Sequence, residues 1–98
     1  MIVFNFNRFG TYLGTRMLGA SAREQLLPLL DEGEKVVLDF EGVEVVSNSF
    51  ADECLAKLLT TMPLDELKQR TTFRGLNDFA RKNIALAIKR RIFALQSA

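Results

Sequence analysis

The stretch from Val36 to Glu53 constrains the fold most strongly, because it joins a buried strand to a polar turn and an amphipathic helix. Val36, Val37 and Leu38 begin a nearly continuous apolar run. Such a run, without polar alternation, is typical of a parallel strand covered on both faces, which is predicted here over Lys35–Phe40.

Three small polar residues follow this strand: Ser47, Asn48 and Ser49. Ser49 is predicted to be the N-cap of the next helix, because Asp52 stands three residues later, as in a capping box. The helix itself is predicted over Phe50–Met62, with its apolar residues on one side. The free N–H groups and the macrodipole at its start suit an anion or a phosphoryl group.

Strands and helices alternate along the rest of the chain. Further strands are predicted over Ile2–Phe6, Thr11–Leu13 and Thr71–Phe73, and further helices after Thr15 and after Asn77 or Asp78. Pro28 is predicted to end or kink the first helix, and Leu64–Gln69 remains open between a helical turn and a loop. This order predicts an α/β domain with a mainly parallel, four-stranded sheet and about three helices.

The segment from Asp39 to Glu53 resembles the STAS domain, the small fold of anti-sigma-factor antagonists. The STAS pattern is Asp-Leu-x-x-Val followed by Asp-Ser-Ser-Gly; Asp39, Gly42 and Val43 match the strand end, and residues 47–50 fall on the tetrad. The Ser-Phe-Ala-Asp-Glu run at 49–53 and Gly-Thr-Arg at 14–16 are closer to a bacterial STAS-like family of unknown function. The resemblance covers residues 10–76 and implies one STAS-like domain over residues 1–98.

The resemblance implies a regulatory role. The serine that a partner kinase phosphorylates in the antagonists falls on Asn48, which has no hydroxyl, and the glycine of the motif falls on Phe50. Any phosphorylation is therefore expected at Ser47 or Ser49. The implied partner is a histidine-kinase-like ATPase or a sigma-factor regulator.

The topology predicts where a partner or ligand would bind. Ligands of open α/β sheets gather outside the carboxyl ends of the strands, where the following helices begin. The residues expected at this edge are Thr15, Arg16, Ser47, Asn48 and Ser49, together with Asn77 and Asp78. Arg16 is the one cation among them and suits a carboxylate or a phosphate. The uncharged members are also ordinary helix caps, so only their convergence supports a site for a partner or an anion.

The residue types present argue against an enzyme. The chain has no histidine, so it lacks the usual general base and the commonest metal ligand. Its one cysteine, Cys54, lies on the apolar face of a helix and is predicted to be a core thiol. Asp39 is predicted to accept loop N–H groups and Glu41 to be solvated, rather than to form a catalytic pair. We therefore expect no catalytic residue, no metal and no cofactor.

Length and hydropathy predict a single domain away from membranes. The 98 residues, 48% of them hydrophobic, are enough for one core. There is no apolar run of about 18 residues, and the first residues lack the order of a secretory signal. A cytoplasmic location is the expectation.

Charge is divided unevenly between the two parts of the chain. Residues 1–63 carry five basic and nine acidic side chains, and residues 64–98 carry eight and three. Lys89, Arg90 and Arg91 lie near a helix C-terminus, where cations are common, and lack interleaved aromatic residues, so nucleic-acid binding is not favoured. The opposite charges favour self-association or a complementary protein surface.

The last helix, predicted over Phe79–Leu95, carries two apolar stripes. The stripe of Ile84, Ile88, Ile92 and Leu95 is predicted to pack on the sheet, whereas Phe79, Leu86 and Phe93 recur every seven residues on another side. In one alternative Phe79 turns into the core at the helix start, and Leu86 and Phe93 are covered by the N-terminal strand or by Leu64 and Leu67. In the other, this second stripe forms a ridge for a partner. The ridge predicts a homodimer through this helix.

These features together predict a non-catalytic protein–protein interaction module of bacterial signalling, similar to an anti-sigma-factor antagonist without the usual phosphoserine. The alternative is a sensor that binds a nucleotide or another small anion at the helix edge.

Overall fold

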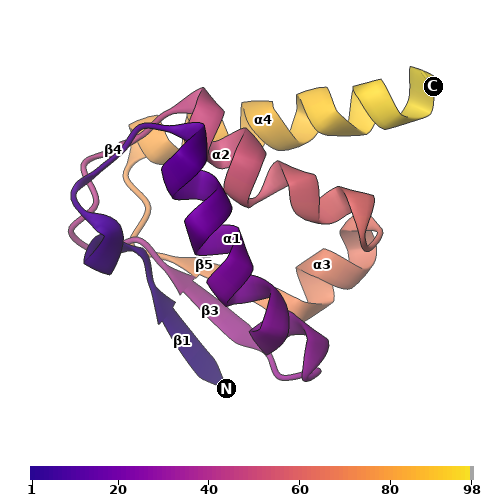
Figure 1. Cartoon of the computed structure of the whole chain (residues 1–98), viewed down its shortest axis with the longest axis horizontal. Helices are drawn as coiled ribbons and strands as arrows, with labels where there is room; N and C mark the ends of the chain where they lie inside the picture. Colours follow the sequence, from indigo (N-terminus) through magenta and orange to yellow (C-terminus); the bar gives the residue numbers. More distant parts are fainter. Residues whose placement is uncertain (98) are drawn as a thin grey trace.

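The computed structural model describes residues 1–97 and shows an α/β arrangement (Figure 1). The elements, in chain order, are β1 (Ile2–Asn5), the 3-10 helix η1 (Phe6–Phe9), β2 (Tyr12–Leu13), α1 (Arg16–Asp31), β3 (Val36–Asp39), β4 (Val45–Val46), α2 (Asn48–Cys54), the 3-10 helix η2 (Ala56–Thr60), α3 (Leu64–Arg70), β5 (Thr71–Arg74) and α4 (Asp78–Ser97).

All strand pairs are parallel, as predicted, but they form two sheets. One has the order β1-β3-β5, with Phe4 opposite Leu38 and Leu38 opposite Phe73, and the other pairs β2 with β4. The prediction of one four-stranded sheet with about three helices is therefore wrong: there are three plus two strands and four α-helices in residues 1–97.

The second sheet arises because β1 and β3 are each followed by a turn. The 3-10 helix η1 follows β1, and a turn closed by the Val43 N–H on the Phe40 carbonyl follows β3. Gly42 lies in that turn with φ +83°, a conformation that favours glycine. The segments that follow β1 and β3 both leave the main sheet at these turns. As a result, β2 and β4 pair with each other instead of with β1 or β5.

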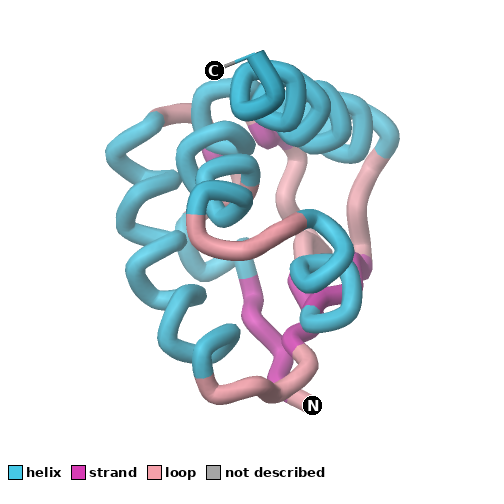
Figure 2. The backbone as a smooth tube through the Cα atoms, turned by 90° about the vertical axis from the view of Figure 1, so that its right-hand side faces the viewer, coloured by secondary structure: helices cyan, strands magenta, loops and turns pink. Residues whose placement is uncertain are grey.

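The core lies between the main sheet and the helices, with α1 on one side of the strands (Figure 2). Phe6 and Phe40 stack at its centre with ring centroids 4.1 Å apart. Helices α1 and α2 approach closely at Gly19, where an added Cβ would lie 3.0 Å from the Glu53 Cβ and 3.1 Å from the Phe50 carbonyl oxygen. The absence of a side chain at Gly19 thus permits this packing.

Helix α1 continues through Pro28 to Asp31, so the prediction that proline ends it is wrong. Proline removes only the bond to the Glu24 carbonyl, and its exposed ring lies within the last turn. The Pro28 carbonyl still accepts the Glu32 N–H at 3.2 Å. The segment Leu64–Gln69, for which the sequence did not decide between a helical turn and a loop, is helical and belongs to α3.

The single helix predicted over Phe50–Met62 is also wrong in its bounds. Helix α2 begins at Asn48 and ends at Cys54, and the chain then tightens into the 3-10 helix η2. The N-cap is Ser47 and not Ser49, because Ser47 directly follows β4 and its hydroxyl accepts the Phe50 N–H. Asp52 therefore has no part in a capping box.

Helix α4 crosses one end of the domain, and its C-terminal end extends past the other elements (Figure 1). It packs against α2, η2 and β4, so the predicted packing of its isoleucine stripe on the sheet is wrong. Ile84 is buried, Ile88 and Ile92 are half-buried, and Leu95 is exposed. No helix within residues 1–97 combines the length and the apolar character needed to cross a membrane.

Candidate functional site

The starts of α1 and α2 are tied together by the hydroxyl of Ser47. This hydroxyl accepts the N–H of Phe50 at 3.0 Å and donates to the carbonyl of Gly14 at 3.0 Å. Thr15, the next residue, caps α1 by accepting the N–H of Leu18 at 3.1 Å. Two of the three hydroxyls that were predicted as ligand contacts at this edge, those of Thr15 and Ser47, therefore serve as structural caps.

The start of α4 is attached to the same region through Asn77. Its side-chain oxygen accepts the N–H of Ala80 at 2.7 Å, and its amide nitrogen donates to the Glu44 carbonyl at 2.9 Å. Asn83, in the second turn of α4, donates to the Val46 carbonyl at 2.9 Å. The segment that leads into α2 is thus held between α1 and α4.

Arg16 is paired with acidic side chains of the same chain, and its predicted contact with a carboxylate or phosphate of a partner stays a prediction. Its guanidinium lies 2.8 Å from a carboxylate oxygen of Asp52 and 3.4 Å from one of Glu53. Arg91 of α4 contacts Asp52 from the other side at 2.7 Å. Burial favours the neutral acid, but the hydrogen bonds from Arg16 and Arg91 outweigh it and lower the pKa of Asp52. The Arg16 side chain is 54% exposed, so an anion could contact its guanidinium beside Asp52.

Glu53 extends these ion pairs into a charge network and is buried between α1 and α2. Its carboxylate is 2.8 Å from Arg23 and 2.9 Å from Lys57, and Arg23 also donates to the Glu53 carbonyl. The hydrogen bond from Arg23 is the main cause that lowers the pKa of Glu53 to about 2. Glu53 is therefore ionised and fully partnered at neutral pH.

A polar hollow lies at the surface between α2 and α4, and Asp52 forms part of its lining. This polar hollow has a volume of about 410 Å³ and is lined by two alanines of α4 and by Arg16, Asn48, Ser49, Asp52, Arg90 and Arg91. Asn48 is exposed at its edge and Ser49 is half-buried. The sequence analysis missed Arg90 and Arg91 as site residues, because no local spacing links position 91 to position 52.

Comparison with known families matches a part of the chain that includes three of the residues lining this hollow, namely Asn48, Ser49 and Asp52. A family model matches residues 19–79, which make up more than half of the chain and include all of β3, β4 and α2. The chain belongs to the STAS-like domain of unknown function (DUF4325). This finding confirms the family that the sequence motifs suggested. No curated protein and no solved structure gives a significant match.

The STAS-like domain places its motif residues in different environments. Asp39, at the end of β3, accepts the Glu41 N–H at 2.9 Å as predicted, and it also lies 2.7 Å from Arg74 of β5. The hydrogen bond from Arg74, followed by that from the Glu41 N–H, lowers the pKa of Asp39. Glu41 is exposed, as predicted. Asp39 thus has a structural role in fastening β3 to β5.

The thiol of Cys54 lies in the core of the STAS-like domain, as predicted. Burial raises the pKa of Cys54 to about 12, so the thiol is protonated at neutral pH. Within the described part of the chain, no three acidic or cysteine side chains form a group that could hold a metal ion.

The heptad residues of α4 lie outside the core cluster of the STAS-like domain. Phe79 is 51% exposed and Phe93 is 73% exposed, whereas Leu86 is half-buried. The expectation that Phe79 turns into the core is therefore wrong. The ridge of Phe79, Leu86 and Phe93 remains a predicted interface.

Proposed function

We propose that this STAS-like domain is a non-catalytic regulatory module whose protein partner docks over Asn48 and Ser49 at the polar hollow. One observation carries the proposal: the position that the family resemblance assigns to the regulatory serine is exposed at the edge of this hollow. The surrounding backbone is fastened by Ser47 and Asn77, so the surface is preorganised for a partner. A histidine-kinase-like ATPase or a sigma-factor regulator in bacterial signalling is the proposed partner.

The absence of catalysis is supported by how the reactive groups are used. The Cys54 thiol is buried and protonated, Asp39 is bound by Arg74, and the Ser47 hydroxyl serves as a cap. The site offers an array of paired charges and one exposed amide. Such a surface suits recognition, because nucleophile and base are not placed side by side.

Phosphorylation, if it regulates this module, is proposed for Ser49 rather than Ser47. A phosphate on Ser47 would remove the proton donated to Gly14 and disturb the cap of α2. Ser49 shares the polar hollow with Arg90 and Arg91, which suit a dianionic phosphate. Mass spectrometry of protein from the native host tests this assignment, and a phosphate found only at Thr60 or Thr61 would contradict it.

The docking surface can be tested with a purified histidine-kinase-like ATPase or sigma-factor regulator from the native host. Asn48→Arg should weaken binding at least about tenfold in calorimetry, because a long cation replaces an exposed amide at the contact. Lys82→Gln, on an exposed turn of α4 outside the hollow, is the control and should bind normally. Equal binding by the Asn48→Arg variant and the wild type would reject this surface.

We also propose that the domain forms a homodimer through the ridge of Phe79, Leu86 and Phe93. The high exposure of the two phenylalanine side chains supports this, as does the opposite charge of residues 1–63 and 64–98. Leu86→Glu should shift light scattering towards the monomer without loss of helical circular dichroism, whereas Arg81→Glu, at an exposed position of α4 away from the ridge, should not. A wild type that is monomeric at high micromolar concentration would exclude the dimer.

A further inference from the structure

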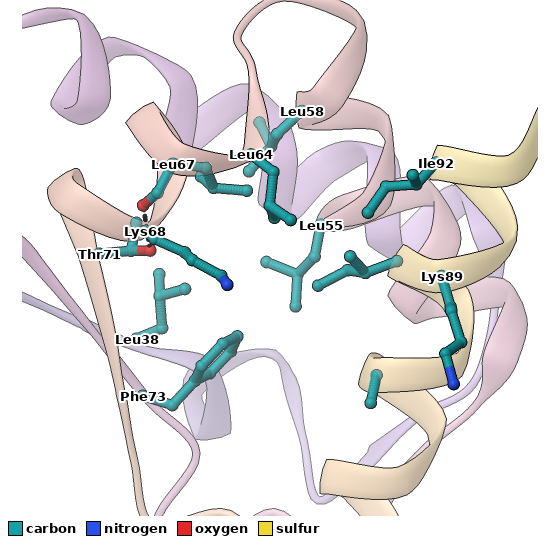
Figure 3. Close-up of a pocket in the computed structure, with 12 residues that line it drawn as sticks. Leu38, Leu55, Leu58, Leu64, Leu67, Lys68, Thr71, Phe73, Lys89 and Ile92 are labelled. Carbon is teal, nitrogen blue, oxygen red and sulfur yellow. Dashed lines mark hydrogen bonds between the residues drawn. The ribbon is translucent and has the colours of Figure 1, made fainter. Parts of the chain in front are cut away.

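An apolar pocket opens on the other side of α4, away from the polar hollow. It has a volume of about 290 Å³ and lies between β3, β5, α3, η2 and α4 (Figure 3). Its floor is formed by Leu38 and Leu55, which are 1% and 2% exposed. The pocket therefore reaches from the surface down to the hydrophobic core.

The pocket exists because α4 packs against α2 and η2 and leaves the outer edge of the main sheet open. β5 is the edge strand on this side, and its Phe73 is 41% exposed. Ile88 and Ile92, which the sequence predicts to cover the sheet, instead form the opposite wall and remain half-buried. Apolar side chains on both walls thus lack the contacts that a filled core would provide.

Two lysines supply the only charges that line this pocket. Lys68 comes from α3 and Lys89 from α4. Figure 3 shows the ammonium group of Lys68 extended into the mouth of the pocket, while that of Lys89 turns outward. No carboxylate lies within ion-pair distance of either ammonium group in residues 1–97. The pocket therefore combines an apolar interior with a positively charged entrance.

We propose that this pocket binds a small lipophilic monocarboxylate, such as a medium-chain fatty acid. The hydrocarbon chain would lie against Leu38, Leu55 and Phe73, and the carboxylate would contact Lys68 at the mouth. Lys89 would add attraction from the opposite wall, since its flexible stem keeps the ammonium group within reach. Both parts of such a molecule match the site: apolar burial drives binding, and the cations select an anionic head group.

The shape favours a single small molecule over a protein segment. A volume of about 290 Å³ is close to the lower end of ordinary small-ligand pockets, at roughly 300 Å³. The pocket is a hollow bordered by five elements with its floor at Leu38 and Leu55, whereas a docked helix would need a groove that takes anchors over several turns. A shallower trough shares Leu64 and Ile92 with the pocket and continues towards Leu95, which leaves room for a longer chain.

Titration of the full chain with decanoate, below its micelle-forming concentration, tests the proposal. Saturable shifts of the Leu55, Leu64 and Ile88 methyl signals in NMR spectra are expected, with binding measured in parallel by calorimetry. Methyl decanoate and decylamine have similar apolar chains without the carboxylate, and acetate has the carboxylate without the chain. Each of these should bind at least about tenfold more weakly than decanoate.

Substitutions can measure separately how much the apolar interior and the charged entrance contribute to decanoate binding. Ala85→Phe places a ring in the pocket from an exposed position of α4 and should abolish decanoate binding. Lys68→Gln should weaken it about tenfold, as expected for a charge-assisted hydrogen bond, and Lys89→Gln should weaken it less. Lys82→Gln removes a lysine of α4 outside the pocket and should bind like the wild type. Circular dichroism verifies folding, and the lysine variants decide the test if Ala85→Phe does not fold.

Several results would overturn the proposal. These are the absence of saturable binding, equal affinity for decanoate and decylamine, and unchanged binding by Ala85→Phe or by Lys68→Gln. A designed acidic amphipathic peptide that binds more tightly and displaces decanoate would assign the pocket to a protein partner. Self-association that Ala85→Phe abolishes would assign it to a second copy of the chain.

Discussion

The polar hollow and the apolar pocket lie on two sides of α4 and differ in how completely their groups are partnered. On one side Arg91 joins Arg16 on the carboxylate of Asp52, and Glu53 beneath them is bound by Arg23 and Lys57. On the other side Lys68 and Lys89 stand over apolar walls that nothing within residues 1–97 fills. The first arrangement holds the fold together, and the second is an apolar cavity with lysines at its entrance.

The difference has an energetic meaning. Buried charges that are fully hydrogen-bonded are costly to disrupt, because removing one partner leaves the others uncompensated. Surface lysines without ion pairs can change at little cost to stability, since they have few native interactions to lose. Mutations at the charge network should therefore affect unfolding, whereas mutations at the pocket entrance should affect ligand binding.

The largest expected effect is at Glu53. Glu53→Ala should lower the free energy of unfolding by about 3 kcal/mol, because it leaves Arg23 facing an apolar interface between α1 and α2 without its carboxylate. Urea denaturation followed by circular dichroism measures the change. Glu24→Ala, on the exposed side of α1, is the matched control and should stay within about 0.5 kcal/mol. Similar losses in both variants would contradict the role of the network.

Acid should weaken the same network. The pKa of Glu53 falls from 4.5 to about 2 on folding, so its contribution is complete above pH 4.5 and is lost as the pH falls towards 2. The pKa values of Asp39 and Asp52 shift in the same direction. We expect about 1–2 kcal/mol less stability from Glu53, since nearby water screens part of the interaction. Urea titrations between pH 7 and pH 2.5 measure it, and the slope should be smaller in Glu53→Gln.

The two serines beside the polar hollow offer a matched comparison. Ser47→Ala should cost about 1 kcal/mol, because it removes both the cap of α2 and the hydrogen bond to Gly14. Ser49→Ala should stay within about 0.5 kcal/mol, since Ser49 is not the cap. Thermal melts of the two variants show which serine stabilises the start of α2. The reverse order would restore Ser49 as the N-cap.

The smallest expected effect is at the entrance of the apolar pocket. The double variant Lys68→Gln and Lys89→Gln should change stability by no more than about 0.5 kcal/mol, because neither ammonium group forms an ion pair within residues 1–97. Urea denaturation provides the measurement, beside Arg91→Ala, which should be less stable because Arg91 is hydrogen-bonded to Asp52. A double variant as destabilised as Arg91→Ala would show that the lysines also hold the fold.

Local signals in the sequence were sufficient for several parts of the structure. The apolar run before Asp39 predicts a buried parallel strand, and β3 is one. Thr15 and Asn77 are recognisable as caps because a small polar residue precedes each apolar stripe. These predictions succeed because strand periodicity and capping depend on neighbours within a few residues.

The N-cap of α2 shows where local reasoning stops. Ser47 and Ser49 both have the chemistry of a cap, and Asp52 made Ser49 the better local candidate. The pairing of β4 with β2 brings Ser47 to the Gly14 carbonyl, and Asp52 is taken by Arg16 and Arg91. Contacts between residues that are 33 or 39 positions apart cannot be predicted from the spacing of neighbouring residues.

By itself, then, the sequence determined the family, the α/β order, the parallel strands and the residue types at the helix starts. Only the tertiary structure decided that the strands divide into two sheets, that Arg16 pairs with Asp52 and Glu53, and that α4 leaves β5 uncovered. The physical reason is range: propensity and periodicity act along the chain, whereas charge pairing and cavity formation depend on which elements meet in space. The apolar stripe of α4 shows this most clearly, since its spacing predicts a buried face and packing alone turns that face into the wall of a pocket.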